Sequence, residues 1–377
     1  MLSGHMQRYQ SLRHRLRREI GRVMQASGRP PSPNLAALLR LFSLGYGAAA
    51  VLRADCYRRR LISPRRLPCK VLSIGNLTVG GTGKTPMTLY AARLGQRLGF
   101  RVAVLSRGYG GRAEHRGGVV HDGRRVCLGP QDAGDEPFML ALRLGNIPVI
   151  VGHDRYRSGL LAVDRFRSDL IVLDDGFQHL QLHRDVNLLL LDFHRPVGNG
   201  FLLPRGSLRE PLSALGRSDA LVLTRMPAGL CGRPSLFHRR IGRRPIFGAF
   251  HRPYILRSAG TETRPAAVGE LSGGPVFAFS GIARNPDFRR TLGELGCQIS
   301  GFMEFSDHHD FSRRDLNAVR RGASAAGCRR LVTTDKDFAR IGHRIEWPDL
   351  MVVGVETSFG DRQPEFDRWI GQRLEGD

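Results

Sequence analysis

The stretch that decides the fold is VLSIGNLTVGGTGKTP, residues 71–86. Its first residues form an apolar run typical of a buried strand, and the run leads directly into a glycine-rich loop. The loop ends in Gly83-Lys84-Thr85, and a helical pattern follows it. A strand, a glycine-rich loop with Gly-Lys-Thr and a helix, in this order, are the context of a phosphate-binding P-loop. The stretch therefore predicts a P-loop at the end of a strand.

Each residue type in this loop has a role that phosphate binding requires. The glycines allow backbone N–H groups to turn toward phosphate oxygens, and the helix adds the positive end of its dipole. Lys84 can reach the β- and γ-phosphates, and the Thr85 hydroxyl can ligate Mg²⁺. Thr78 stands where the standard pattern has its first glycine. The predicted nucleotide-binding residues are Thr78, Val79, Gly80, Gly81, Thr82, Gly83, Lys84 and Thr85. A glycine-rich turn without a nucleotide is the alternative.

The chain that follows alternates short apolar runs with helical patterns. The runs are continuously apolar, as is typical of parallel strands covered on both faces. They span residues 70–74, 102–105, 148–151, 170–173, 187–191, 220–223, 276–279, 331–333 and 351–355. Helical patterns at 85–98 and 154–166 lie between runs, and helix-start signals occur at 285–287 and 312–315. The alternation predicts an α/β fold with a P-loop NTPase-like, mostly parallel sheet and a second, smaller α/β domain.

The domain boundary is expected in residues 226–275, a stretch rich in Arg, Gly and Pro and poor in strand signals. The 377 residues suffice for about two domains, each with its own core. We expect a basic N-terminal extension (1–33), a P-loop domain with an N-terminal membrane-associated helix (34–240) and a smaller α/β domain (241–377). The C-terminal end of the smaller domain can pack back on the first domain.

A second acidic motif ends the apolar run at 170–173, where Asp174 and Asp175 follow. A strand that ends in acid next to a P-loop strand is typical of a Walker-B motif, whose carboxylates hold Mg²⁺ directly or through water. Guanine-binding proteins of this class carry an Asn/Thr-Lys-x-Asp loop, and none of the three lysines follows Asn or Thr. The predicted cofactors are therefore ATP and Mg²⁺, with Thr85, Asp174 and Asp175 on the metal side.

Two further polar motifs are candidates for chemistry. In SDHHD (306–310), Asp307, His308 and His309 can form a metal cluster, an acid/base pair or a solvated loop. In AGDEPFML (133–140), Asp135 and Glu136 open a helix, where acidic residues commonly act only as caps. The residues alone leave these alternatives open.

The most apolar long stretch is LAALLRLFSLGYGAAAVL, residues 35–52. As a helix it would extend about 27 Å, just short of a hydrocarbon core, and it contains Arg40. Six arginines follow within residues 53–66, where they could meet anionic headgroups. The pattern favours two alternatives equally: a helix lying in a membrane interface, and a buried core helix with a basic flank.

Net charge is the other unusual property of the chain. Its 58 Lys and Arg against 34 Asp and Glu give a formal net charge of +24, which favours an anionic partner such as a membrane surface. The arginines are spread along the whole chain without a nucleic-acid-binding motif, so no nucleic-acid partner is predicted. The six cysteines, Cys231 among them, form no CxxC pair, so we expect reduced thiols rather than a zinc ribbon.

Several stretches together resemble one family, the tetraacyldisaccharide 4′-kinases of lipid A synthesis. The resemblance covers about residues 35–340, and Thr78 in the P-loop is also similar to the family's own pattern. The first 30 or so residues and the far C-terminus do not match clearly. The matching stretches are GNLTVGGTGKTP (75–86), LSRGYGG (105–111), GDEP (134–137), LDDGFQH (173–179), RDVNLLLLD (184–192), LPRGSLREP (203–211), SDALVLTR (218–225), FSGIARNPDF (279–288), FSDHHDF (305–311) and VTTDKD (332–337).

The resemblance implies an ATP- and Mg²⁺-dependent kinase that phosphorylates the 4′-hydroxyl of an acylated glucosamine disaccharide 1-phosphate lipid. It implies an active site between two α/β domains and a location at the cytoplasmic face of the inner membrane, peripheral or monotopic, on an anionic surface. By resemblance, Asp135 is the base that takes the sugar hydroxyl proton, and Asp307 with His308 tunes it. The remaining expected site residues are Lys84 for catalysis, Gln178 at the nucleotide, Glu210 on the metal side and Arg209 lining the site.

Other classes of protein remain as alternatives at this point. The main one is a membrane-associated P-loop ATPase without a sugar acceptor. A metal phosphoesterase using Asp307, His308 and His309 would leave the P-loop unexplained. A nucleic-acid-binding protein would account only for the net charge.

Overall fold

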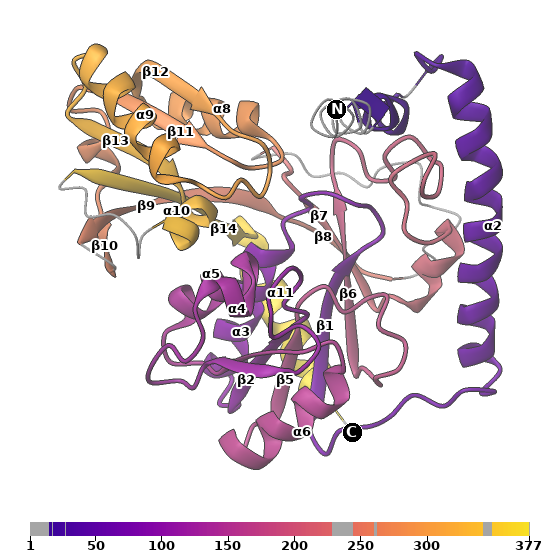
Figure 1. Cartoon of the computed structure of the whole chain (residues 1–377). Coiled ribbons are helices and arrows are strands. Elements are labelled where there is room, and N and C mark those ends of the chain that lie inside the picture. Colours follow the sequence, from indigo (N-terminus) through magenta and orange to yellow (C-terminus); the bar gives the residue numbers. More distant parts are fainter. Residues whose placement is uncertain are drawn as a thin grey trace, which may run out of the picture.

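The computed structural model describes residues 15–16, 18–26, 28–227, 244–259, 262–341 and 349–376. The described strands form two sheets, one of eight strands and one of six, with the six-stranded sheet at the upper left of Figure 1. Residues 1–14, 17 and 27 of the N-terminal extension and residues 228–243 of the expected boundary region, with Cys231 among them, lie outside the described residues.

The eight-stranded sheet is the one that carries the P-loop. Its strand order is β3-β4-β2-β5-β1-β6-β7-β8, and every neighbouring pair is parallel except β3 with β4. The strand before the P-loop, β1, lies between β5 and β6, so the acidic end of β5 is beside the loop. The strands are β1 (Lys70–Asn76), β2 (Val102–Ser106), β3 (Gly118–His121), β4 (Val149–Val151), β5 (Leu170–Leu173), β6 (Val186–Asp192), β7 (Ala220–Thr224) and β8 (Ile246–Gly248).

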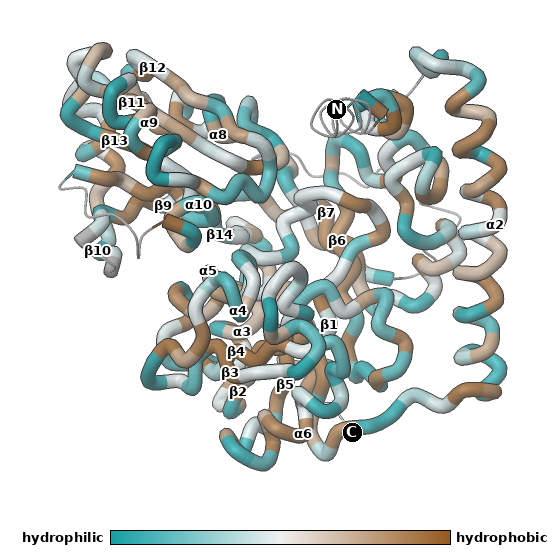
Figure 2. The backbone as a smooth tube through the Cα atoms, in the orientation of Figure 1, coloured by the Kyte–Doolittle hydropathy of each residue, from teal (hydrophilic) through white to brown (hydrophobic). Residues whose placement is uncertain are grey.

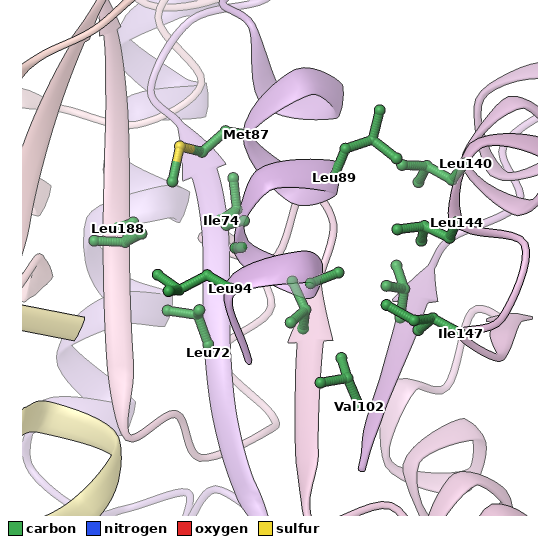
Figure 3. Close-up of a cluster of buried hydrophobic side chains, with 14 of the residues drawn as sticks. Leu72, Ile74, Met87, Leu89, Leu94, Val102, Leu140, Leu144, Ile147 and Leu188 are labelled. Atoms are coloured by element: carbon green, nitrogen blue, oxygen red, sulfur yellow. The ribbon is translucent and has the colours of Figure 1, made fainter. Parts of the chain in front are cut away.

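Helices cover both faces of this sheet, which explains why its central strands are mostly apolar and buried at nearly every position. Leu72 and Ile74 pack with Met87, Leu94 and other residues in one core cluster (Figure 3). The alternate residues of the same strands pack on the opposite face. The first cluster involves α3 (Lys84–Arg97) and α5 (Asp135–Leu144), the second α6 (Arg155–Phe166); α4 (Pro130–Ala133) precedes α5, and a 3₁₀ helix spans Leu212–Arg217.

The six-stranded sheet has the order β10-β9-β14-β13-β11-β12. Strands β11 to β14 run parallel, whereas β9 and β10 are antiparallel to their neighbours. Ser312 caps a helix through a capping box with Asp315, as the sequence predicts. The elements are β9 (Phe250–Ala259), β10 (Glu262–Ala266), β11 (Pro275–Ser280), α8 (Asn285–Glu294), β12 (Gln298–Glu304), α9 (Arg313–Ala325), β13 (Arg330–Thr334), α10 (Asp335–Ile341), β14 (Leu350–Ser358) and α11 (Gln363–Glu375), with 3₁₀ turns at Val268–Glu270 and Gly360–Arg362.

The expectation that residues 226–275 are poor in strands is wrong, because β8, β9 and β10 all lie there. These strands are at or near sheet edges, and two of them are antiparallel, so they do not need a continuous apolar run. Strand β9 is held in the sheet by antiparallel pairing with β14 over eight residue pairs. The first sheet extends to β8, which lies beyond the expected boundary at residue 240.

The N-terminal apolar stretch forms one long helix, α2 (Pro33–Arg58), along one side of the molecule (Figures 1 and 2). Only Ala36, Leu39, Ser43 and Gly47 of this helix are buried. Its large apolar side chains are exposed: Leu38, Leu41, Phe42, Leu44, Val51 and Leu52. The alternative of a buried core helix is therefore wrong. By length and composition alone, α2 is long and apolar enough to cross a membrane.

The C-terminal helix α11 returns to the first sheet. Phe366 is fully buried in the core cluster of the first sheet, stacked on Phe359 with ring centroids 4.0 Å apart. Phe247 of β8 meets the Phe366 ring edge-on at 5.0 Å. The last residues of the chain thus complete the core of the sheet that begins with β1.

We expect Phe366→Ala to lower the free energy of unfolding by about 3–5 kcal/mol, because it leaves a cavity in this aromatic cluster. Urea denaturation followed by circular dichroism measures this quantity. The matched control is Arg368→Ala on the exposed face of the same helix, which should change it by less than about 0.5 kcal/mol. Equal effects of the two substitutions would contradict the packing of α11 described above.

Candidate active site

The P-loop connects β1 to α3, and two glycines in it have positive φ. Gly83, with φ of +79°, is the N-cap of α3, so the helix begins at Lys84 and directs its first N–H groups into the loop. A Cβ at Gly83 would lie 2.9 Å from Nε2 of His251, a partly buried residue of β9. Burial and the Arg225 charge lower the pKa of His251 to about 4. Only glycine fits at this position.

Side chains and a neighbouring segment hold the loop from outside. Asn76 donates through Nδ2 to the Thr78 carbonyl at 2.6 Å and to the Thr82 hydroxyl at 2.8 Å. The Val79 N–H donates to the Ser207 carbonyl at 2.7 Å, so the segment 201–209 braces the loop. These contacts hold the loop in a defined shape.

Lys84 lies beside the second acid of the Walker-B motif. Its Nζ is 3.8 Å from Oδ1 of Asp175, and Nη1 of Arg209 donates to the same carboxylate at 2.8 Å. Burial acts to raise the pKa of Asp175, but the Lys84 and Arg209 charges outweigh it and hold the pKa below its ordinary value. Gln178 donates to the Asn76 carbonyl at 2.9 Å, which places it under the loop. Asp175 is therefore an ionised carboxylate at the phosphate site.

Asp174 is more deeply buried than Asp175 and, among the described residues, forms no ion pair. Its two oxygens accept hydrogen bonds from the Thr88 and Ser106 hydroxyls, each at 3.1 Å. Burial, and after it the charges of Glu136 and Asp175, raise the pKa of Asp174 to about 6. Glu136 is in the first turn of α5, and α5 packs against α3, the helix that follows the P-loop.

The structure does not place Glu210 with the other predicted metal residues. Its Oε2 accepts a hydrogen bond from Nη2 of Arg217 at 2.6 Å, and the side chain lines a cavity of about 380 Å³ beside α2. Among the described residues, no cluster of three or more His, Cys, Asp and Glu side chains could hold a metal ion. Oxygen donors fit Mg²⁺ when phosphates and water supply further ligands, and the Thr85 hydroxyl and the Asp175 carboxylate are such donors.

Asp135 lies at the first turn of α5, where the two sheets meet. Its Oδ2 accepts from Nε of Arg340 at 2.7 Å and is 3.1 Å from Nδ1 of His308. Burial acts to raise the pKa of Asp135, but the hydrogen bond from His308 and the charge of Arg340 hold it below its ordinary value. Asp135 and His308, 173 residues apart in sequence, therefore form one unit.

The other ring nitrogen of His308 contacts a second cation. Its Nε2 is 3.3 Å from Nζ of Lys336, which also donates to Glu136 at 3.2 Å and lies 3.8 Å from Asp307. His308 thus has Asp135 and Arg340 at Nδ1 and Lys336 at Nε2. Asp307 thus acts on the unit through Lys336 and His308 and has no direct contact with Asp135 among those described.

His309 has a different environment from His308. Its ring stacks on Phe305 with centroids 4.7 Å apart, and its Nε2 is 3.1 Å from Asp315. The two histidines therefore serve separate partners, and the geometry does not favour a shared metal cluster of Asp307, His308 and His309.

Sequence reasoning missed two members of this interface. Arg340 carries no motif signal in an arginine-rich chain, and only its place on α10 brings it to Asp135. Lys336 had a signal that could have been used, because it is one of only three lysines and lies in the matching stretch VTTDKD. Both residues lie on α10, in the unit of the second sheet, and contact Asp135 or Glu136 at the start of α5.

Comparisons with known proteins agree on one family. A family model described as tetraacyldisaccharide-1-P 4′-kinase matches residues 35–375. The tetraacyldisaccharide 4′-kinase of Desulfatibacillum aliphaticivorans is 38% identical over 371 residues, 96% of this chain and 98% of the relative. The one of Syntrophus aciditrophicus is 44% identical over 321 residues, 81% of this chain and 84% of the relative.

A solved structure is also similar over most of the chain. The crystal structure of LpxK from Aquifex aeolicus in complex with ATP superimposes with a TM-score of 0.75 and 31% identity, over 90% of this chain and 99% of that one. These findings confirm the α/β fold class and the kinase activity expected from the resemblance, and they do not favour a P-loop ATPase without an acceptor. The chain belongs to the tetraacyldisaccharide 4′-kinase family, the ATP-dependent kinases of lipid A biosynthesis.

Proposed function

We propose that the chain transfers the γ-phosphate of MgATP from the P-loop to the 4′-hydroxyl of an acylated disaccharide 1-phosphate, at the junction of its two α/β units. The observation that carries this proposal is the environment of Asp135. Its partly buried carboxylate is held by His308 and Arg340 at the start of α5, the helix that packs against α3 after the P-loop. The chain then has three parts, which are the N-terminal extension, the P-loop domain extended to β8, and the smaller α/β domain.

In this proposal the P-loop residues and Lys84 bind the ATP phosphates. The N–H groups at the start of α3 and the Lys84 ammonium would offset the charge of the transferring phosphoryl group. The Thr85 hydroxyl and the carboxylate of Asp175, with Asp174 behind it, would hold Mg²⁺, whose chemistry is to neutralise the β- and γ-phosphate oxygens. Glu210 as a further ligand stays a prediction that the present position of its carboxylate does not support.

Asp135 would accept the proton of the sugar hydroxyl as the bond to phosphorus forms. Its lowered pKa keeps it ionised and also makes it a weak base. Phosphoryl transfer requires little proton removal before the transition state, so positioning the hydroxyl matters more than basicity. His308 and Arg340 fix the orientation of the carboxylate, and His308 can share the proton.

The membrane contact would be made by α2. Its exposed leucines and Phe42 form an apolar side, and the arginines after residue 52 would meet anionic headgroups. The cavity beside α2 is lined by apolar side chains and by charged ones of both signs, which suits an amphiphile with a polar head group. The charged residues are Asp55, Arg58, Arg184, Glu210 and Arg217. We place the enzyme at the cytoplasmic face of the inner membrane, peripheral or monotopic, with no nucleic-acid partner.

We expect Lys84→Ala to lower kinase turnover by at least about a hundredfold in a protein that stays folded, because the Lys84 ammonium opposes charge in the transition state. Lys84→Arg should also have low kinase turnover, since the planar guanidinium of arginine does not replace the compact ammonium of lysine. A coupled ADP assay with mass spectrometry of the lipid measures both variants. Lys70→Ala is the matched control, because Lys70 contacts the Gly376 carbonyl at the surface. Wild-type turnover in Lys84→Ala would refute the P-loop assignment.

Asp135→Ala and His308→Ala should each lower turnover by about 10²–10⁴, with little change in MgATP affinity. The double variant should be scarcely worse than the poorer single one, since the two residues act as a unit. His309→Ala, in a separate environment, is the control and should stay within about twofold. Additive losses in the double variant would mean that Asp135 and His308 have independent roles.

The pH profile gives a separate expectation for the same pair. His308 lowers the pKa of Asp135, whereas burial raises it. Removing His308 leaves burial less opposed, so the acidic limb of kcat/KM in His308→Ala should move to higher pH. An acidic limb at the same pH as in the parent enzyme would show that Asp135 is not the group that titrates.

Charged substitutions on the exposed side of α2 test the membrane contact. Leu41→Glu, Leu44→Glu and Leu52→Glu together should abolish cosedimentation with anionic vesicles and leave MgATP affinity unchanged, because these side chains are largely exposed to solvent. Val126→Glu with Val268→Glu, at exposed apolar positions elsewhere, is the matched control. Undiminished sedimentation of the α2 variant would place the anchor elsewhere.

A further inference from the structure

Two residues at the end of β7 hold carbonyl groups of the P-loop. Thr224 donates through its hydroxyl to the Thr82 carbonyl at 2.9 Å, and Arg225 donates through Nη2 to the Gly81 carbonyl at 2.8 Å. Phosphate binding requires the N–H groups of such a loop to face inward, so the carbonyls must face away. Thr224 and Arg225 supply the donors that keep them there.

Arg225 is also the centre of four charges that join the two units. Its Nη2 pairs with Asp192 at the end of β6, and its Nη1 is 3.3 Å from Asp287 in the first turn of α8. Arg284, just before α8, is 3.4 Å from Asp192 and 3.7 Å from Asp287. Arg225 and Asp192 belong to the unit of the first sheet, and Arg284 and Asp287 belong to the unit of the second sheet. The side chains of Arg225 and Asp192 are only 14% and 4% exposed, so solvent screens their pairing weakly.

The backbone of Arg225 is adapted to this role. Its φ of +58° is uncommon for a residue with a side chain, and it carries a conformational cost that surrounding contacts must offset. The following N–H, of Met226, donates to the Ala249 carbonyl, and the Phe193 N–H donates to the Thr224 carbonyl. The chain is thus fixed on both sides of Arg225 while the guanidinium extends toward the loop.

We propose that Arg225 is a positioning residue that couples the shape of the P-loop to the position of the second α/β unit through Asp287. This inference rests on the P-loop being the ATP site of the proposed function. With Asp287 on Nη1, the planar guanidinium is oriented so that Nη2 reaches Gly81. When the second unit withdraws Asp287, one orienting contact is lost and the Gly81 carbonyl is held less firmly. By linkage, bound MgATP then favours the arrangement in which the two units are joined here.

The test is the MgATP affinity of the full chain, measured by calorimetry, together with steady-state kinetics. Arg225→Gln should raise the Kd for MgATP about tenfold or more, the size expected for losing a hydrogen bond from a charged group. KM for ATP should rise more than kcat falls, and KM for the lipid should not change. Arg225→Lys keeps the charge but lacks the planar guanidinium that reaches the Gly81 carbonyl, Asp192 and Asp287 together. This variant should therefore recover only part of the MgATP affinity. A variant that was only less stable would not raise KM for ATP selectively while KM for the lipid stayed unchanged.

Asp287→Asn tests the coupling at a half-exposed position where folding is not at risk. It should weaken MgATP binding by about two- to fivefold, and its effect should disappear in the Arg225→Gln background. Arg290→Gln is the matched control, because Arg290 also pairs with Asp287 but no described contact joins it to the loop. Equal affinities for Asp287→Asn and Arg290→Gln would overturn the coupling, and unchanged affinity in folded Arg225→Gln would overturn the positioning role.

Lys84→Ala separates this inference from the proposed function. If Lys84→Ala loses MgATP affinity while the Arg225 and Asp287 variants keep it, only the coupling fails. If Lys84→Ala keeps its affinity too, the P-loop assignment itself fails, and the coupling with it.

Discussion

Arg143 of α5 and Asp335 of α10 form a bidentate ion pair across the two units, with side chains only 10% and 8% exposed. The Tyr254 hydroxyl donates to the same carboxylate, and Arg143 also donates to the Thr263 hydroxyl at 2.8 Å. A buried pair of this kind adds little net stability, because desolvation offsets much of its attraction. Its planar geometry instead fixes how one helix lies against the other.

The acceptor side of the active site follows from that contact. Asp135 begins the same helix that carries Arg143, and Arg340 lies on the same helix as Asp335. Because a helix is a stiff rod, fixing Arg143 on Asp335 also fixes Asp135 against Arg340 and, through it, against His308. The nucleotide side has its own charged contact between the units, at Arg225. The two contacts together hold Asp135, the proposed base, in place relative to the P-loop.

The sequence predicted those parts of the fold that are coded locally. The P-loop could be identified by its glycine-rich Gly-Lys-Thr motif, and the buried parallel strands by their short, mostly apolar runs. The Ser312–Asp315 capping box could be identified because its pattern lies within four residues. Strands β8, β9 and β10 were missed because edge and antiparallel strands tolerate Arg and Pro. The unit of Asp135 and His308 was drawn from family resemblance, since nothing local joins residues 173 apart. Arg340 was missed for the same reason, whereas Lys336 carried a local signal, because it is one of only three lysines and lies in VTTDKD.

The most direct test of this account is the turnover of the double variant Arg143→Gln with Asp335→Asn. Replacing both partners leaves no unpaired buried charge, so the protein should fold, but the bidentate contact that orients α5 against α10 is lost. The account predicts that lipid phosphorylation falls about tenfold or more, because small misplacements of reacting groups are costly, while the Kd for MgATP stays within about twofold. Wild-type turnover in the folded double variant would show that the alignment of Asp135 does not depend on this ion pair.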